Sequence, residues 1–249
     1  MADQHRPKPI FLTGAWRWLV MLNFEVDPKT LANRVPRGCL LDDHQGRYFV
    51  SLVGFLFYET RVLGIPIPWH RTFEEVNLRF YVRREVNDEI RRGVVFIREI
   101  VPRLAIAAVA RWAYNEPYIA LPMRHTLKPP AGDLAPPSAI NYQWLWQRKW
   151  NEMHFAPQGE GAIPVSGSHE EFITEHYYGY TRQSNGSTIE YRVEHPIWRQ
   201  WSSLDYHFQV DVASLYGEEF APFVRGKAFS ALLAEGSPII VRKPTLMPV

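Results

Sequence analysis

The sequence contains very little cysteine, and this scarcity excludes several kinds of chemistry. One cysteine, Cys39, occurs among 249 residues, so we expect no internal disulfide and no zinc site built from cysteines. Cys39 lies in "PRGCLLDD", which we interpret as a turn leading into a strand, with the cysteine as a small buried residue. The alternative, a nucleophilic thiol, depends on its burial and pKa.

Long hydrophobic runs are also missing. No stretch approaches the roughly 20 apolar residues of a membrane span. The N-terminal "MADQHRPKPIF" lacks the apolar core of a signal peptide. We therefore expect a cytoplasmic protein with no membrane partner.

Lysine is also scarce. The chain contains Lys8, Lys29, Lys128, Lys149, Lys227 and Lys243. None of them lies in a strongly apolar strand, where loss of solvent would lower the pKa of the amine for imine chemistry. The other basic residues are arginines, which bind carboxylates and phosphates bidentately, although compositional bias also explains their number. Because the net charge is only +2, we expect no nucleic-acid partner. The aromatic "NYQWLWQRKW" could stack bases, but alternating tryptophans are more typical of a core.

The common catalytic and nucleotide-binding motifs are absent. The chain has no G-x-S-x-G nucleophile elbow, no G-x-x-x-x-G-K-[ST] phosphate loop and no G-x-G-x-x-G dinucleotide motif. It also has no H-E-x-x-H pair of metal ligands. We predict neither a cofactor nor a metal site.

Apolar and aromatic residues are plentiful, at 46% and 14% of the chain. This composition is typical of a globular protein with a large core. No internal repeat is visible, and the loops at 129–138 and 156–168 lie between strands that need partners. We therefore predict one domain over residues 1–249.

The hydrophobic pattern predicts mostly strands, at residues 14–25, 46–60, 72–84, 91–101, 140–150 and 229–243, the last broken at Gly236. A short helix should begin at Asp27-Pro28 and end before Pro36, and a longer helix is expected over 104–114.

The segment 72–84 alternates most cleanly. Its apolar side consists of Val76, Leu78, Phe80 and Val82, and its other side of Glu75, Asn77, Arg79 and Tyr81. The polar turn at 87–89 should make it a hairpin partner of 91–101.

Asn185-Gly186 is the strongest turn signal, because this dipeptide favours two-residue hairpins. That register pairs Tyr180 with Tyr191 and Tyr178 with Val193, and it places His176 opposite His195 on the drier face. Three interpretations stay open: structural histidines, a pocket wall with acid and base capacity, or a metal site, for which two ligands are too few. The preceding "HEEFITEH" is read as strand, which puts its two histidines on opposite faces.

Several segments together resemble the YqjF-like family of uncharacterised bacterial proteins and, more remotely, the acetoacetate-decarboxylase-like superfamily. The resemblance covers nearly the whole chain and is carried by "VDPKTLANRVPRGCLLD", "VGFLFYETRVLGIPIPWHRTFEEVNLRFYVRR", "YIALPMRH", "EEFITEHYYGYTRQ" and "EYRVEHPIW". It implies an antiparallel, closed or cone-like β-barrel with a few short helices and a central pocket, which is an α+β, β-rich fold.

The resemblance also bears on chemistry, because the decarboxylase uses a Schiff-base lysine beside a second cation. Met123 matches the position of that lysine, and a thioether forms no imine. Arg124 stands where the second cation would be, and Arg17 resembles the pocket arginine. The acidic pocket residues have no clear match, with Glu59 and Glu75 as nearby candidates.

We therefore expect a pocket that binds a small anionic or carbonyl compound without a lysine imine, in an enzyme of lyase or hydrolase type if it is an enzyme. The alternative is a non-catalytic ligand sensor or interaction scaffold. Homo-oligomerisation is left open. The expected ligand-binding residues are Arg17, Arg124, Glu75, Asn77 and Tyr178, and the candidates for proton transfer are His125, His176 and His195.

Overall fold

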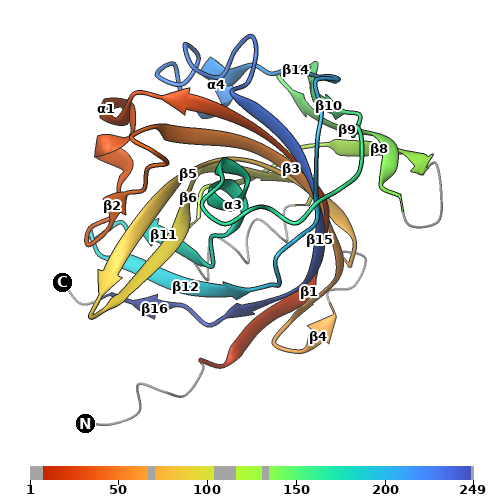
Figure 1. Ribbon diagram of the computed structural model, residues 1–249. Coiled ribbons are helices and arrows are strands. Elements are labelled where there is room, and N and C mark those ends of the chain that lie inside the picture. Colours follow the sequence, from red (N-terminus) through yellow and green to blue (C-terminus); the bar gives the residue numbers. More distant parts are fainter. Residues whose placement is uncertain (1–7, 67–70, 104–115, 131–134, 248–249) are drawn as a thin grey trace.

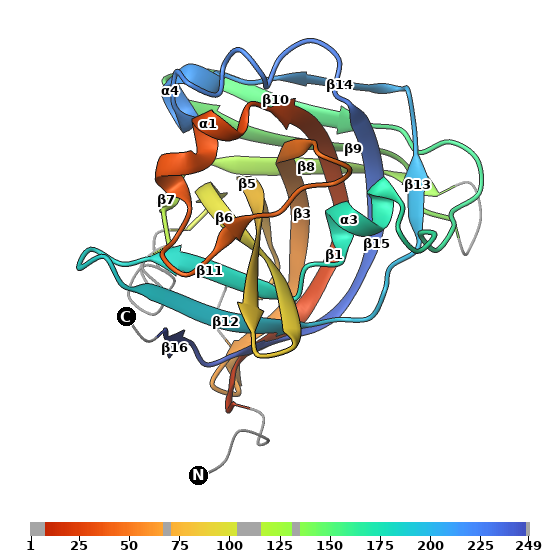
Figure 2. The same cartoon turned by 60° about the vertical axis from the view of Figure 1, so that its left-hand side comes forward.

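The computed structural model describes residues 8–66, 71–103, 116–130 and 135–247. Its strands form a 12-stranded sheet and a 4-stranded sheet. The larger sheet curls into a ring, which Figures 1 and 2 show from two directions. In ring order the strands are β15 (Ser230–Arg242), β1 (Ile10–Val26), β3 (Tyr48–Val62), β5 (Phe73–Val86), β6 (Glu89–Val101), β11 (Tyr178–Arg182) and β12 (Thr188–Glu194).

The ring is closed where β12 pairs with β15, at Val193–Val241 and Glu194–Ile240. Most neighbours in the ring are antiparallel, whereas β6 and β11 run parallel. Short strands extend the sheet: β2 (Leu40–Leu41), β4 (Ile65–Pro66), β7 (Tyr118–Ala120), β13 (Gln200–Ser202) and β16 (Thr245–Leu246). The structure therefore confirms the predicted closed barrel.

The 4-stranded sheet packs on the outside of the barrel. Its strands are β8 (Met123–Pro130), β9 (Pro137–Trp146), β10 (Lys149–Phe155) and β14 (Tyr206–Gln209). Their buried side chains join one hydrophobic core with the outward side chains of β1, β3, β5 and β6. Gly54 of β3 permits the close approach, because a Cβ there would lie 2.8 Å from Tyr142 and Met153.

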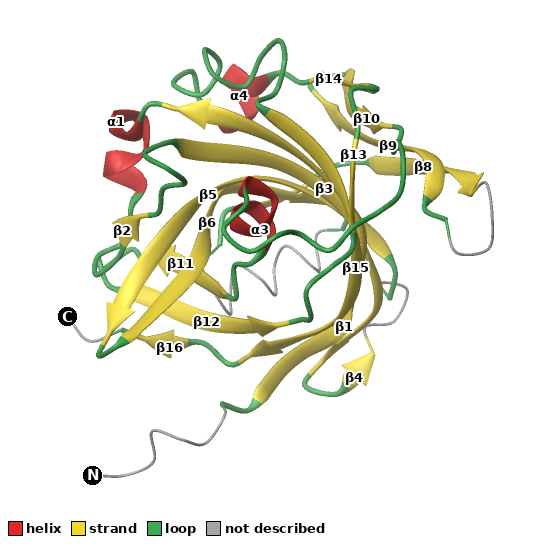
Figure 3. Ribbon diagram, viewed as in Figure 1, coloured by secondary structure: helices red, strands yellow, loops and turns green. Residues whose placement is uncertain are grey.

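Helices are few and short in the described residues. They are α1 (Pro28–Leu31) with a following 3-10 turn (Ala32–Arg34), α3 (His169–Thr174) and α4 (Val212–Tyr216). Figure 3 shows α3 within the opening of the ring. Phe172 and Ile173 of α3 belong to a second hydrophobic core, which lies on the inner side of the barrel.

Much of the predicted pattern is confirmed. The strands at 14–25, 46–60, 72–84 and 91–101 all exist, and the Asp27 side chain caps α1 by accepting from the Lys29 N–H at 2.9 Å. The alternation of β5 is also real, but Glu75, Asn77 and Tyr81 are as buried as Leu78, because they face the barrel interior instead of solvent.

Other predictions are wrong. Segment 140–150 is a hairpin, because Gln147 and Arg148 both adopt positive φ, at 45° and 66°, and turn β9 into β10. Segment 169–174 is helical, because the Ser168 hydroxyl caps it by accepting from the Glu171 N–H at 3.2 Å. The two histidines of "HEEFITEH" are therefore not on strand faces.

The hairpin around Asn185-Gly186 is shifted by one residue from the predicted register. Gly179, not Tyr180, lies opposite Tyr191. The loop is longer than two residues: Gln183 N–H donates to the Ser187 carbonyl at 2.8 Å, and the Asn185 side chain accepts from the Ser187 N–H at 3.0 Å.

The final strand is not broken at Gly236. β15 runs through this glycine, which has φ 80° and lies so close to the Trp16 carbonyl that a Cβ would come within 2.1 Å of it. The proposed loop at 129–138 is shorter than expected, since β8 reaches Pro130 and β9 begins at Pro137. The helix predicted over 104–114 lies outside the described residues.

Candidate functional site: a cavity inside the barrel

The barrel encloses a cavity of about 130 Å³. Strands β1, β3, β5, β6 and β12 supply most of its wall, and Thr174 and His176 supply the part nearest α3. One side of the wall is aromatic: the Trp16 ring contacts Phe55, Phe57 and Trp198 edge to face, and Phe57 stacks on Phe73 at 4.8 Å. This apolar lining favours a ligand with an apolar body.

Three glutamates in the same cavity wall carry the most unusual chemistry. Glu75 lies on β5, Glu99 on β6 and Glu116 just before β7, and they are 3%, 1% and 6% exposed. They line the cavity together with Asn77 and Tyr118. Carboxyl groups are rarely buried without partners, so each contact matters.

The partners of these carboxyl groups are neutral donors. Asn77 Nδ2 donates to Glu75 Oε1 at 3.0 Å, and the Tyr118 hydroxyl donates to Glu75 Oε2 at 3.1 Å. The hydroxyl groups of Thr181 and Tyr191 donate to Glu116 Oε1. No full positive charge is among these contacts.

Burial is therefore the main influence on their protonation. It raises the pKa of Glu75 to about 8 and that of Glu116 to about 7. It also raises the pKa of Glu99 far above its usual range, with the nearby charges of Glu116 and Glu75 acting in the same direction. The Glu99 and Glu116 side chains are hydrogen-bonded to each other, so one of them carries the proton. Near neutral pH this carboxyl cluster (Glu75, Glu99 and Glu116) offers O–H donors to a ligand.

Arg79 is the cation of the cavity. It follows Glu75 and Asn77 on the same face of β5, and its Nη2 reaches the Ile173 carbonyl at 3.4 Å. Its Nε is buried without a hydrogen-bond partner. Across the described residues Arg79 forms no ion pair, so its charge is available to an anionic ligand.

Two of the three predicted histidines meet at this cavity. The His176 ring lies over Tyr81, with 4.6 Å between ring centroids, and its Nε2 is 3.7 Å from Asp42 Oδ2. Burial lowers the pKa of His176 to about 4. His195 stacks on Trp198 at 4.1 Å, and burial lowers its pKa too.

Unsatisfied polar atoms are concentrated around the cavity. Those that belong to lining residues are Trp16 Nε1, Thr60 Oγ1, Asn77 Oδ1, Arg79 Nε, Glu99 Oε2 and both ring nitrogens of His176. Since leaving a buried polar group unpaired costs about 1–3 kcal/mol, this concentration makes the cavity the candidate functional site.

The other predicted site residues lie elsewhere. Arg17 is on the outside, where Nη1 donates to the Gly236 carbonyl at 3.2 Å and Glu235 lies 3.9 Å away. Arg124 is exposed on β8, stacked over Trp150 at 4.1 Å, and its Nε donates to Gln143.

Met123 and His125 also lie on β8. Met123 is half-buried against the outer core, and His125 Nδ1 is 2.6 Å from Glu74 Oε1. Tyr178 borders the cavity, but its hydroxyl donates to Glu89 at 3.3 Å.

Residues outside the cavity offer little further chemistry. Burial raises the pKa of Cys39 to about 12, which keeps the thiol protonated and unreactive. Within the described ranges, no group of three histidine, cysteine, aspartate or glutamate side chains is arranged to hold a metal ion. No described helix is long and apolar enough to cross a membrane.

Sequence reasoning missed Arg79, Glu99, Glu116 and Asp42. Arg79 had a signal, because it shares the alternating face of Glu75 and Asn77. Glu99 follows from the predicted hairpin, in which it pairs with Asn77. Glu116 and Asp42 have no such pattern, since distant parts of the chain bring them to the site.

Comparison with known proteins places the chain in a family. The model of DUF2071, whose description is an uncharacterized conserved protein, matches residues 13–238. The chain belongs to the DUF2071 family. No curated protein matches its sequence.

Several solved structures share the DUF2071 chain's fold. The enduracididine biosynthesis enzyme MppR, complexed with pyruvate, has a TM-score of 0.67 at 11% identity, covering 98% of this chain and 92% of its own. Acetoacetate decarboxylase from Legionella pneumophila has a TM-score of 0.63 at 10% identity, and the match covers 100% of this chain and 92% of the decarboxylase chain. An acetoacetate decarboxylase-like enzyme from Sphingomonas wittichii RW1 has a TM-score of 0.64 at 12% identity, and the match covers 99% of this chain and 98% of the enzyme's chain. At these identities the likeness shows the fold, which confirms the resemblance at that level.

Proposed function

We propose that the cavity binds a small oxo acid, with its carboxylate at Arg79 and its carbonyl group at the carboxyl cluster. The observation that carries this proposal is the row Glu75, Asn77 and Arg79 on one face of β5. It places neutral carboxyl donors and a cation without an ion-pair partner among the described residues on the wall of one otherwise apolar cavity.

The spacing of this row limits the ligand. Residues two apart on a strand are about 6.6 Å apart along the chain, and Glu99 pairs with Asn77 across the hairpin. A ligand whose carboxylate and carbonyl groups are adjacent, or are separated by a few carbon atoms, matches this interval. A cavity of about 130 Å³ is close to the size of an engineered 150 Å³ cavity that holds benzene. The ligand should therefore have roughly six to ten non-hydrogen atoms.

Chemistry at this site, if it turns over its ligand, does not use a lysine imine. All six lysines are exposed, and none is among the lining residues. The pyruvate complex of MppR supports the proposed ligand class by analogy, since pyruvate is an oxo acid and the two folds are alike.

The proposal retains the predicted anionic or carbonyl ligand. The positive charge that binds this ligand is assigned to Arg79 in place of Arg17 and Arg124. The exposure of those two arginines favours the alternative of a non-catalytic protein. The cavity itself fits a ligand sensor as well as an enzyme, and it disfavours a pure interaction scaffold.

Titration calorimetry and thermal shift with pyruvate, acetoacetate and 2-oxobutanoate test the proposal. Arg79→Met should weaken binding by about tenfold or more, because it removes a charge-assisted hydrogen bond worth roughly 1.5–3 kcal/mol. The matched control is Arg98→Met: Arg98 is a half-buried arginine on neighbouring β6 that is not a lining residue.

Two results would overturn the proposal. One is the absence of binding by all three acids. The other is a loss of affinity in Arg17→Met or Arg124→Met while Arg79→Met binds normally, which would support the site expected from sequence.

A further inference from the structure

His176 occupies a fixed position at the end of the cavity nearest α3. Its backbone N–H donates to the Thr174 carbonyl at 3.1 Å. Its ring is held between Tyr81 and Phe172, with centroid distances of 4.6 and 5.4 Å. The side chain is 2% exposed and faces the cavity. A ring held in this way has one orientation to offer a ligand.

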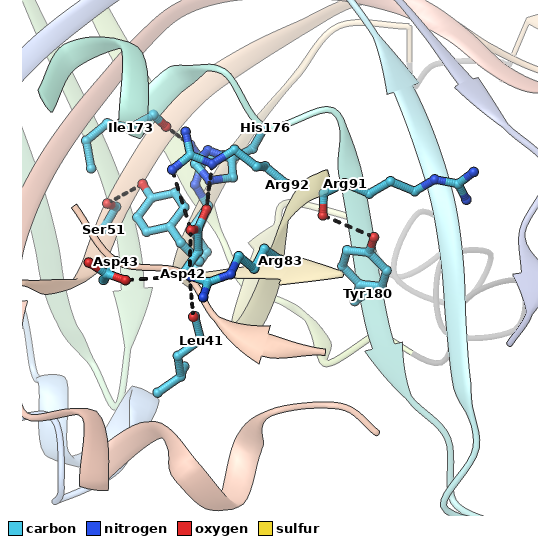
Figure 4. A network of polar contacts seen from close by, with 12 residues as sticks. Leu41, Asp42, Asp43, Ser51, Arg83, Arg91, Arg92, Ile173, His176 and Tyr180 are labelled. Carbon is cyan, nitrogen blue, oxygen red and sulfur yellow. Dashed lines mark hydrogen bonds and ion pairs between the residues drawn. The ribbon is translucent and has the colours of Figure 1, made fainter. Parts of the chain in front are cut away.

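Asp42 provides a reason for one tautomer of that ring. Arg92 Nε donates to Asp42 Oδ2 at 2.8 Å, and Arg83 lies 3.6 Å from Oδ1 (Figure 4). Burial pushes the pKa of Asp42 up, but its contacts with His176 and Arg92 outweigh this effect and lower the pKa overall. The carboxylate is therefore charged, and it faces His176 Nε2 at 3.7 Å.

A carboxylate beside one ring nitrogen favours the proton on that nitrogen. With Nε2 protonated, Nδ1 of His176 carries the lone pair. Nδ1 is buried and has no hydrogen-bond partner. The 3.7 Å separation exceeds a hydrogen bond, as is common for catalytic contacts in unliganded enzymes.

Ligand binding would also strengthen this base. Burial is the main cause of the low pKa of His176, and the charges of Arg79 and Arg92 lower it further. A ligand carboxylate at Arg79 would neutralise one of those charges, so the pKa of His176 should rise when an oxo acid binds.

The acid partner is Glu99. It is 1% exposed, its Oε2 has no partner, and it lines the same cavity. A buried carboxylic acid that stays protonated near neutral pH can donate to a carbonyl oxygen as charge develops there.

We infer that the cavity enolises its bound oxo acid, with His176 Nδ1 removing a proton from the carbon next to the carbonyl group while Glu99 protonates the carbonyl oxygen. This inference rests on the proposed binding function. The C–H bond breaks as an N–H bond forms on His176, and the C–H electron pair becomes the C=C bond of the enol. The π electron pair of the carbonyl group forms a new O–H bond with the proton that leaves Glu99. His176 gains one proton and Glu99 loses one, so the step needs no oxidant or second reactant. Asp42 is a positioning residue.

Exchange of the methyl protons of pyruvate in D₂O, followed by NMR, tests the inference. The wild-type protein should accelerate deuterium incorporation over buffer near neutral pH. His176→Gln should lose about a hundredfold or more of that acceleration, the usual contribution of a general base, while it still binds pyruvate in calorimetry.

His169→Gln is the matched control and should keep the exchange. His169 is also a half-buried histidine of α3 with a pKa lowered to about 4 by burial, but it bonds to Ser230 and is not a lining residue.

Asp42→Asn separates positioning from structure through the pH profile. Loss of the Asp42 charge should lower the pKa of His176 further, because that charge raises it now. The acid limb of the exchange rate should then move to lower pH, and the rate at neutral pH should fall about tenfold because the base is weaker.

Failure of this inference can be told from failure of the binding proposal. If the wild-type protein binds pyruvate without exchanging its protons, or if His176→Gln exchanges them at the wild-type rate, the enolisation is wrong and the binding function stands. If pyruvate, acetoacetate and 2-oxobutanoate all fail to bind, both are wrong.

Discussion

The two faces of β5 are equally buried but built for different purposes. On the outward face, Leu78 and Phe80 are 0% exposed and belong to the hydrophobic core that the barrel shares with the second sheet. On the inward face, Glu75 and Asn77 are 3% and 1% exposed, and unpaired polar atoms remain beside them. The outward face stabilises the fold, whereas the inward face costs stability. Natural proteins tolerate such a cost mainly at functional sites.

The largest effect should come from the outward face. Phe80→Ala should reduce the free energy of unfolding by about 3–5 kcal/mol, since it leaves a cavity in a close-packed core. Urea denaturation measures this loss, and Phe80→Leu, which keeps most of the volume, should lose far less. A loss below about 1 kcal/mol would mean that the outward core repacks freely and the comparison fails.

The pH dependence of stability should reveal the inward face. The folded pKa of Glu75, about 8, lies above its ordinary value, so the folded state holds a proton that the unfolded state releases. The stability that this proton contributes is complete below the ordinary pKa and is lost as the pH rises through about 8. Each such carboxyl changes the stability by up to about 1.4 kcal/mol per pH unit. Urea unfolding of Glu75→Gln should show a flatter profile in this range.

Glu74 is the matched control on the same strand, and it should behave in the opposite way. Burial pushes its pKa up, but the hydrogen bond from His125 and backbone contacts outweigh this and lower it. Glu74 therefore contributes stability that is lost as the pH falls through its folded pKa. A Glu74→Gln protein whose profile is flatter at alkaline pH would contradict this assignment of signs.

The smallest effect should come from Arg79. Because its Nε lacks a partner, Arg79→Met should change the free energy of unfolding by less than about 1 kcal/mol and could raise it. Arg92→Met should cost more, about 3 kcal/mol, since the buried Asp42 would lose the cation that donates to it and keep only the longer contact with Arg83. Equal losses in the two variants by urea denaturation would show that Arg79 is a structural residue.

The sequence predicts the wall of the barrel better than its contents. The alternation of β5, the Asp27 cap and the hairpin at 87–89 depend on neighbouring residues, so the pattern reveals them. Ser168 and Glu171 also form a helix-start signal, Ser-x-x-Glu, and this local signal favours the observed helix over the strand interpretation of the segment.

Two kinds of feature have no recognisable pattern in the sequence. The first is the turn at Gln147 and Arg148, which adopt positive φ although neither is glycine or asparagine. The second is any contact between residues that are distant in the chain. Glu116 reaches Tyr191 across 75 positions of the chain, and Asp42 reaches Arg92 across 50. The resemblance to the decarboxylase directed attention to Met123 and Arg124, which the second sheet holds outside the cavity.

The pairing of β1 with β15 has a consequence for synthesis of the chain. Asn23 of β1 hydrogen-bonds to Ser230 of β15, which is 207 positions later. At translation rates of about 5–20 residues per second, on the order of 10–40 s pass before β1 meets this partner. During that interval an apolar strand edge is open to pairing with other nascent chains. Expression at lower temperature or with a chaperone that shields strands should therefore raise the folded yield more than any change within the cavity.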